Sequence, residues 1–156
     1  MPNDTILILE KESHIQWTVK TLLENERYIV IAVNSIDRAL QNFSEFEVSG
    51  LITEYRIGQS ITLETIRSVK KQFPETYIMM ITDNDVKEDE YEEIMSAGVD
   101  DYFLKPIPVT KILIHLKKGL KQRHICLQKK KIENELASMT NNKNTQESED
   151  IKPLQT

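Results

Sequence analysis

The sequence predicts an α/β fold in which a doubly wound parallel sheet carries helices on both faces. Apolar segments of strand length alternate five times with amphipathic segments of helix length. Most of the strand segments are continuously apolar, which is typical of strands that are covered on both faces. Strict alternation and right-handed crossovers leave few ways to wind such a sheet. We therefore expect a flavodoxin-like (βα)5 arrangement with the strand order 2-1-3-4-5.

The expected strands are short and rich in Ile, Val, Leu or Tyr. They are Thr5–Leu9, Tyr28–Val33, Gly50–Thr53, Tyr77–Thr82 and Asp101–Leu104. Because parallel strands are joined by crossovers, their carboxyl ends should all meet at one edge of the sheet.

The expected helices combine an apolar face with recognisable ends. They span 13–26, 35–44, 62–73 and 87–97, followed by a last helix that starts near Pro108. Either Asn34 or Ser35 is a suitable cap for the second helix. The acidic residues 88–90 suit the positive end of the fourth helix, and Gly98 suits its left-handed end.

The length of 156 residues allows one ordinary domain and an extension. We expect the domain to occupy residues 1–122 and a helical extension to occupy residues 123–139. Residues 140–156 are polar, which predicts a disordered tail.

Several patterns favour a cytoplasmic protein that has no membrane partner. No apolar run approaches the ~20 residues that are needed to cross a bilayer. The N-terminal residues 1–4 lack the pattern of a secretory signal. The single cysteine, Cys126, has no partner within the chain for a disulfide.

The net charge of −5 conceals an uneven distribution. Residues 117–131 carry seven basic and no acidic side chains, whereas residues 1–116 carry more acidic than basic ones. An acidic domain argues against broad nucleic-acid binding by its surface. The basic segment itself has three interpretations: a solvated extension of the last helix, a dimerisation or docking helix, or a site for an acidic partner or nucleic acid.

Charged and polar side chains follow the expected strands at their carboxyl ends. Glu10-Lys11-Glu12 follows the first strand, Glu54 the third, and Lys105-Pro106 the fifth, while Thr82 ends the fourth. Such a group of carboxylates, ammonium groups and a hydroxyl suits either the handling of a phosphoryl group or an internal network of ion pairs.

Four segments resemble the receiver domain of bacterial two-component response regulators. They are residues 6–12 (Ile-Leu-Ile-Leu-Glu-Lys-Glu), 51–56 (Leu-Ile-Thr-Glu-Tyr-Arg), 80–82 (Met-Ile-Thr) and 97–106 (Ala-Gly-Val-Asp-Asp-Tyr-Phe-Leu-Lys-Pro). The resemblance covers roughly residues 5–122, in order and at nearly matching spacing, and its last segment is the most specific.

The resemblance implies a role for each matching position. In this family two acidic residues follow the first strand and an aspartate ends the third. The second acid and that aspartate hold Mg²⁺, and the aspartate accepts a phosphoryl group from a partner histidine. Glu10 and Lys11 occupy the positions of the acidic pair, and Glu54 that of the phosphoacceptor. The residues that match the phosphate contacts are Thr82 and Lys105, and Tyr102 matches the switch aromatic.

Lys11 and Glu54 depart from the family pattern in ways that affect the chemistry. Magnesium requires oxygen ligands at ~2.1 Å, and an ammonium group cannot be one. The carboxylate of Glu54 lies about one bond further from the backbone than that of aspartate, and a misplacement of ~1 Å can cost on the order of 10²-fold in rate. We therefore expect no metal, no cofactor and no catalytic residue, and a pseudo-receiver that is not an enzyme.

Three interpretations of the altered site remain open. In one, Lys11 takes over the charge of the metal, and Glu54 imitates a phosphoryl group between Lys11 and Lys105. In the second, the site is a relic that is kept as a salt bridge because unpaired buried charges are costly. In the third, some phosphorylation persists, at Glu54 or at another residue such as Thr53.

The resulting functional prediction is a receiver-like module that acts by protein–protein interaction in signal transduction. Expected partners are a histidine kinase or an output protein, bound at the face formed by the fourth helix, fifth strand and fifth helix. A homodimer through that face or the C-terminal helix is a further possibility. The alternatives are a phosphorelay receiver with unusual acceptor chemistry and a nucleic-acid-associated regulator that uses residues 117–131.

Overall fold

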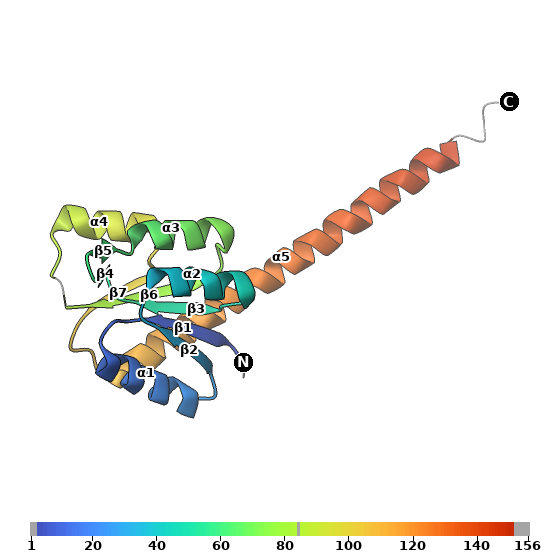
Figure 1. Cartoon of the computed structure of the whole chain (residues 1–156). Coiled ribbons are helices and arrows are strands. Elements are labelled where there is room, and N and C mark those ends of the chain that lie inside the picture. Colours follow the sequence, from blue (N-terminus) through green and yellow to red (C-terminus); the bar gives the residue numbers. More distant parts are fainter. Residues whose placement is uncertain (1–2, 84, 152–156) are drawn as a thin grey trace. The chain divides into compact units, whose positions relative to one another are not determined.

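The computed structural model describes residues 3–83 and 85–151, with side chains described as far as residue 142. A five-stranded sheet forms the centre of the domain (Figure 1). Its strands are β1 (Thr5–Leu9), β2 (Ile29–Val33), β3 (Gly50–Thr53), β6 (Tyr77–Thr82) and β7 (Asp101–Leu104). All neighbouring pairs are parallel, in the order β2-β1-β3-β6-β7. This confirms the predicted flavodoxin-like order 2-1-3-4-5, since β4 and β5 lie outside the sheet.

The register of the strands aligns their carboxyl ends. Leu9 pairs with Thr53 across β1 and β3, and Thr82 pairs with Leu104 across β6 and β7. The residues that follow these strands therefore emerge side by side at one edge, as expected for parallel strands. This register positions the candidate site.

Helices cover both faces of the sheet (Figure 1). One face carries α2 (Ile36–Glu45), α3 (Leu63–Gln72) and α4 (Glu88–Ala97), and the other carries α1 (Ser13–Asn25) and the beginning of α5 (Val109–Ile151). Because side chains alternate along a strand, β1 supplies both cores. Leu7 and Leu9 join the core beneath α2–α4, whereas Ile6 and Ile8 join the core beneath α1 and α5.

Two predicted helix ends have the expected capping features. The side chain of Ser35 accepts a hydrogen bond from the backbone N–H of Arg38 at 3.2 Å, as an N-cap residue does. Gly98 ends α4 in the left-handed region with φ +119°, a conformation that side-chain-bearing residues rarely adopt. These local signals explain why the helix boundaries differ from the prediction by only a residue or so.

Two segments differ from the sequence-based expectation. A short antiparallel hairpin, formed by β4 (Arg56–Ile57) and β5 (Ser60–Ile61), lies where no strand is expected, with Gly58 at φ +64° in the turn. Helix α5 extends to Ile151, so residues 140–151 are helical where a disordered tail is expected. Residues 152–156 of that tail lie outside the described residues.

The chain divides into two compact units, residues 1–123 and residues 124–156. The first contains the sheet and its covering helices, and its boundary lies next to the expected limit at residue 122. In the second unit, the helical residues Ile125, Ile132, Leu136 and Met139 are exposed. Within the described residues, no helix is long and apolar enough to cross a membrane.

Gly119 in α5 permits a close approach between this helix and the sheet. A Cβ atom on Gly119 would overlap the ring of Tyr77, a buried residue of β6 whose hydroxyl donates to Asp101 Oδ2 at 2.5 Å. The glycine that looks like a weak point in the helix is thus required by packing.

We predict that Gly119→Ala destabilises the domain. The gain in helix propensity is ~1 kcal/mol, whereas overpacking against a fixed ring costs ~1–3 kcal/mol. Urea unfolding followed by circular dichroism measures the difference, with Lys118→Ala at the neighbouring exposed position as the control. An unchanged or higher unfolding midpoint for Gly119→Ala would contradict the packing argument.

Candidate functional site

Three charged side chains from different strand ends converge at the carboxyl edge of the sheet. Lys105 Nζ lies 3.1 Å from Glu10 Oε2 and 2.8 Å from Glu54 Oε2. All three side chains are largely buried, with exposed fractions of 13% for Lys105, 7% for Glu10 and 8% for Glu54. Buried charges persist only when they are paired, so each member of this cluster depends on the others.

The second oxygen of each carboxylate accepts a backbone hydrogen bond. Glu10 Oε1 accepts from the N–H of Glu12 at 3.2 Å, and Glu54 Oε1 accepts from the N–H of Tyr55 at 2.7 Å. Each carboxylate is therefore held at both oxygens, by the backbone on one side and by Lys105 on the other. Such charge-assisted bonds are stronger than neutral ones.

The pKa values in the cluster reflect the competition between burial and pairing. Burial raises the pKa of Glu10 above its usual value, although the Glu12 N–H and Lys105 pull it down. Burial by itself would lower the pKa of Lys105, but hydrogen bonds to Glu54 and Glu10 outweigh it and raise that pKa. The ammonium form of Lys105 is thus secured by its two carboxylates.

Lys11 lies beside this cluster but does not join it. The side chain of Lys11 is exposed, and its Nζ lies near the backbone of Gly58 in the β4–β5 hairpin. Among the described residues, Glu54 is ion-paired with Lys105 and not with Lys11. A depression of about 450 Å³ opens here, lined by Glu10, Lys11, Glu12, Glu54, Arg56, Gly58 and Asp83. Sequence reasoning missed Asp83, although its place directly after Thr82 at a strand end was a usable signal.

The remaining matched positions lie around the cluster on β6 and β7. Thr82 is fully buried, and its carbonyl accepts a hydrogen bond from the N–H of Lys105 at 2.8 Å. The ring of Tyr102 meets the ring of Tyr91 edge-on, with their centroids 5.6 Å apart. Burial raises the pKa of Tyr102, with a smaller contribution from Asp85. Tyr102 therefore links β7 to α4.

Other candidate residues do not gather into a site. Thr53, the alternative acceptor, is 2% exposed, and its hydroxyl donates to the carbonyl of Glu54 at 2.9 Å. Within the described part of the chain, no three His, Cys, Asp or Glu side chains form a group that could hold a metal ion. Cys126 is exposed.

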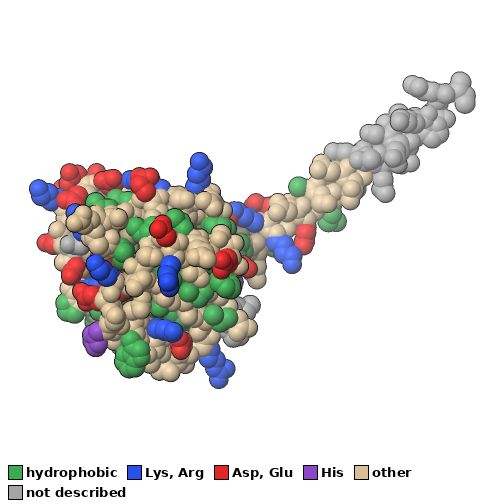
Figure 2. Space-filling view, viewed as in Figure 1, with side chains coloured by type: hydrophobic (Ala, Val, Ile, Leu, Met, Phe, Trp, Pro, Cys, Tyr) green, Lys and Arg blue, Asp and Glu red, His purple; other side chains and the backbone are tan. Residues whose placement is uncertain are grey.

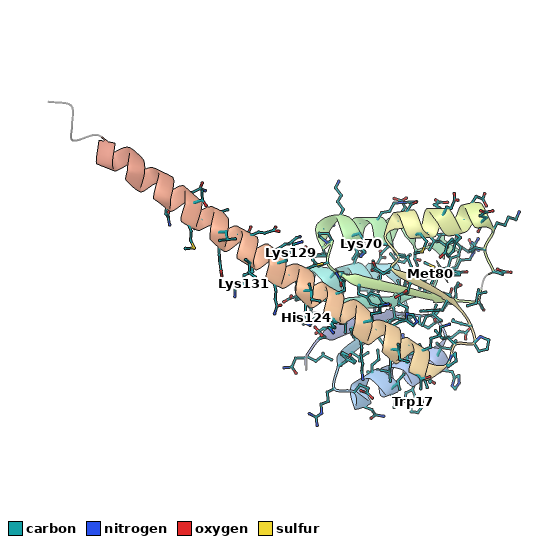
Figure 3. The ribbon with its side chains drawn as sticks, turned by 180° about the vertical axis from the view of Figure 1, so that it is seen from behind. Trp17, Lys70, Met80, His124, Lys129 and Lys131 are labelled. Atoms are coloured by element: carbon teal, nitrogen blue, oxygen red, sulfur yellow. The ribbon has the colours of Figure 1, made fainter. Side chains whose placement is uncertain are left out.

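The basic segment 117–131 spans both units of the chain. Two of its members in the first unit form ion pairs, Lys117 with Glu26 and Arg123 with Glu47, both at 3.1 Å. In the second unit, Lys129, Lys130 and Lys131 are exposed on the helix, and two of these are labelled in Figure 3. Part of the positive charge is therefore engaged within the domain.

We predict that Lys105→Met destabilises the domain by about 3–5 kcal/mol near neutral pH, because two buried carboxylates lose their cation. Without Lys105, the pKa of Glu10 in the folded state rises further above its value in the unfolded chain. A carboxyl group with a raised folded-state pKa contributes stability at low pH, and this contribution is lost as the pH rises through the folded-state pKa. The deficit should therefore be smaller at about pH 5 than at about pH 8.

Urea unfolding at the two pH values measures this dependence. Lys117→Met is the matched control, since Lys117 forms an exposed ion pair with Glu26 that is worth at most ~1 kcal/mol. An equal deficit for Lys105→Met at both pH values would show that the carboxylates do not depend on this cation.

Comparisons with known proteins agree with this architecture. The family model described as "Response regulator receiver domain" matches residues 6–117. Among solved structures, a CheY-like receiver domain protein from Methanospirillum hungatei has a TM-score of 0.73 at 21% identity, covering 78% of this chain and 96% of that one. The beryllofluoride-activated NtrC4 receiver domain dimer has a TM-score of 0.71 at 18% identity, covering 76% of this chain and 98% of that one.

Curated relatives are longer proteins. The hydrogenase transcriptional regulatory protein HoxA of Cupriavidus necator is 26% identical over 65% of this chain and 21% of its own length. The alginate biosynthesis transcriptional regulatory protein AlgB of Pseudomonas syringae is 26% identical over 84% of this chain and 29% of its own length. The chain thus spans less than a third of either relative. Because the receiver-domain model matches residues 6–117, which is more than half of the chain, this chain belongs to the receiver-domain family of two-component response regulators.

Proposed function

We propose that this chain is an atypical receiver module, which signals by protein–protein interaction and without ordinary Mg²⁺-dependent phosphorylation. The observation that carries the proposal is the closed cluster in which Lys105 bridges Glu10 and Glu54. In this proposal the chain is a binding module rather than an enzyme. Its output depends on which partner recognises its surface.

The residues at the strand ends fit a divalent ion poorly. Magnesium needs several oxygen ligands in near-octahedral geometry, and Lys11 stands where the family has one of its acidic ligands. Glu10 and Glu54 each direct one oxygen to a backbone N–H and the other to Lys105. A metal would therefore have to displace a buried ammonium from its partners while approaching a second one.

The same cluster disfavours Glu54 as an acceptor. Attack on a phosphoryl group requires an accessible, aligned oxygen, and the two oxygens of Glu54 are held at 2.7 Å and 2.8 Å by their hydrogen-bond donors. The separation of Glu54 from Lys11 supports the interpretation as a retained salt bridge over the one in which Lys11 replaces the metal. In both interpretations, the charges of the site stay the same because no phosphoryl group is added to it.

The face formed by α4, β7 and α5 is the proposed partner surface. Tyr91 on α4 and Leu104 on β7 are exposed apolar side chains there, at 43% and 45%. Acidic side chains gather over α4 at the upper left of Figure 2, among them Glu88, Asp89 and Glu90. An apolar centre with an acidic rim favours partners with basic surfaces, such as a histidine kinase or an output protein.

We predict that the chain gains no phosphoryl group when it is incubated with acetyl phosphate and Mg²⁺. Intact-mass spectrometry detects the addition as an increase of ~80 Da. The double variant Lys11→Asp/Glu54→Asp, which restores the family's ligand and acceptor, is the positive control and should gain that mass. A stable adduct on the unaltered chain that disappears in Glu54→Gln would overturn the proposal.

We also predict that millimolar MgCl2 leaves the thermal unfolding midpoint of the unaltered chain unchanged. A ligand stabilises a fold by RT ln(1 + [L]/Kd), so a protein that lacks an adequate ion site gains nothing. The same double variant should show a midpoint that rises with MgCl2 and not with equal ionic strength of NaCl. A magnesium-specific rise in the unaltered chain would contradict the proposed loss of metal binding.

A further inference from the structure

A second pocket of about 450 Å³ shares Glu10, Glu12 and Asp83 with the depression around Lys11, and residues of α1 and of the start of α5 contribute to its lining. It differs from the depression around Lys11 because most of its lining is apolar. Aliphatic side chains from β1, β3, β6, α1 and α5 make up most of the lining.

The floor of this pocket belongs to the rigid part of the fold. Ile8, Ile52 and Ile81 come from three adjacent strands and join the core beneath α1 and α5. Val19 of α1 and Ile112 of α5 form part of the same core. A wall of aliphatic side chains fixed by a sheet and two helices provides a preformed apolar surface, as small-molecule sites usually do.

The rim of the pocket is acidic. Glu12 and Asp83 are exposed carboxylates of the lining that also border the depression around Lys11, while Glu10 and Lys105 are paired with each other. His14 is the other basic side chain of the lining. The rim therefore favours a positively charged group, since Lys105 is already shared between two carboxylates.

We propose that this pocket binds a small amphipathic amine, with an apolar body about the size of one aromatic ring and a protonated amino group. The apolar body would lie on the isoleucine floor, and the ammonium would lie at the rim near Glu12 and Asp83. A volume of about 450 Å³ is within the range of ligand pockets and large enough for such a molecule. Burial of the ring supplies the affinity, and the rim charge supplies the selectivity.

The position of the pocket would bring such a ligand into contact with residues that belong to other parts of the domain. Lys105 and Pro106 form part of its wall, and Lys105 holds Glu10 and Glu54. An occupant would therefore contact the loop that links β7 to α5, next to the proposed partner face. This inference does not depend on whether Glu54 accepts a phosphoryl group.

Methyl NMR of the full chain with labelled isoleucine tests the proposal, with 2-phenylethylamine as the probe. Saturable shifts are expected for the δ1 methyls of Ile8, Ile52 and Ile81. The methyls of Ile66 and Ile94, which lie in the opposite core, should stay unchanged. Absence of saturable shifts at millimolar amine, or equal shifts in both cores, would overturn the proposal.

Two chemical controls test the role of charge. The neutral analogue 2-phenylethanol and the anion phenylacetate have the same ring but lack the ammonium group. The amine should bind more tightly than the alcohol, and the anion most weakly. Equal affinities, or tighter binding of the anion, would refute the amine assignment.

Matched variants test the location. Thr18→Phe fills the pocket from α1 and should abolish the shifts, whereas Thr21→Phe makes the same change on α1 outside the lining. Unchanged signals of Ile66 and Ile94 show that each variant is folded. Glu12→Gln should weaken amine binding roughly 2–5-fold, and Glu24→Gln should not. Full amine binding by Thr18→Phe would place the ligand elsewhere and overturn the proposal.

Discussion

The pairing of Lys105 with Glu10 and Glu54 is the constraint on which the functional edge of this domain depends. Two carboxylates and one ammonium are buried together, and desolvation makes each of them unfavourable alone. The parallel register brings the three strand ends together, and the backbone N–H groups of Glu12 and Tyr55 hold the remaining oxygens. Because each charge is held from two directions, the cluster is both stable and closed. In the proposed function, this arrangement favours the binding of a partner over the exchange of a phosphoryl group.

The two faces of the sheet have separate cores, because side chains alternate along each strand. Residues such as Leu7 and Leu9 pack beneath α2, α3 and α4, while Ile6 and Ile8 pack beneath α1 and α5. Tyr102 packs against the core on the first face and contacts Tyr91, which belongs to the proposed partner surface. The core on the second face includes the isoleucine side chains that line the pocket. Lys105 and Pro106 line this pocket, and Lys105 also belongs to the charged cluster, so the β7–α5 connection is common to both.

Helix α5 shows how a residue that is unfavourable locally can be required globally. Glycine lowers helix propensity, yet a side chain at Gly119 would overlap the ring of Tyr77. The close approach allows Leu116 and Leu120 on either side to be buried against the sheet. A glycine that lowers helix propensity thus stands where the helix packs closely against Tyr77.

The sequence alone determined the alternation of the five sheet strands with their helices, the ends of the first four helices to within a residue or so, and the residues that follow each strand. It could do so because strand periodicity, capping and helix-ending glycines are local properties. The four segments that resemble receiver domains, together with the strand order, were therefore predictable. Only the tertiary structure decided which charges meet. Glu10 and Lys105 are distant in sequence, and Lys11 could as well have turned towards Glu54. It also decided the β4–β5 hairpin and the pocket between α1 and α5, because both depend on how separate segments pack, and no local pattern encodes a space between two helices.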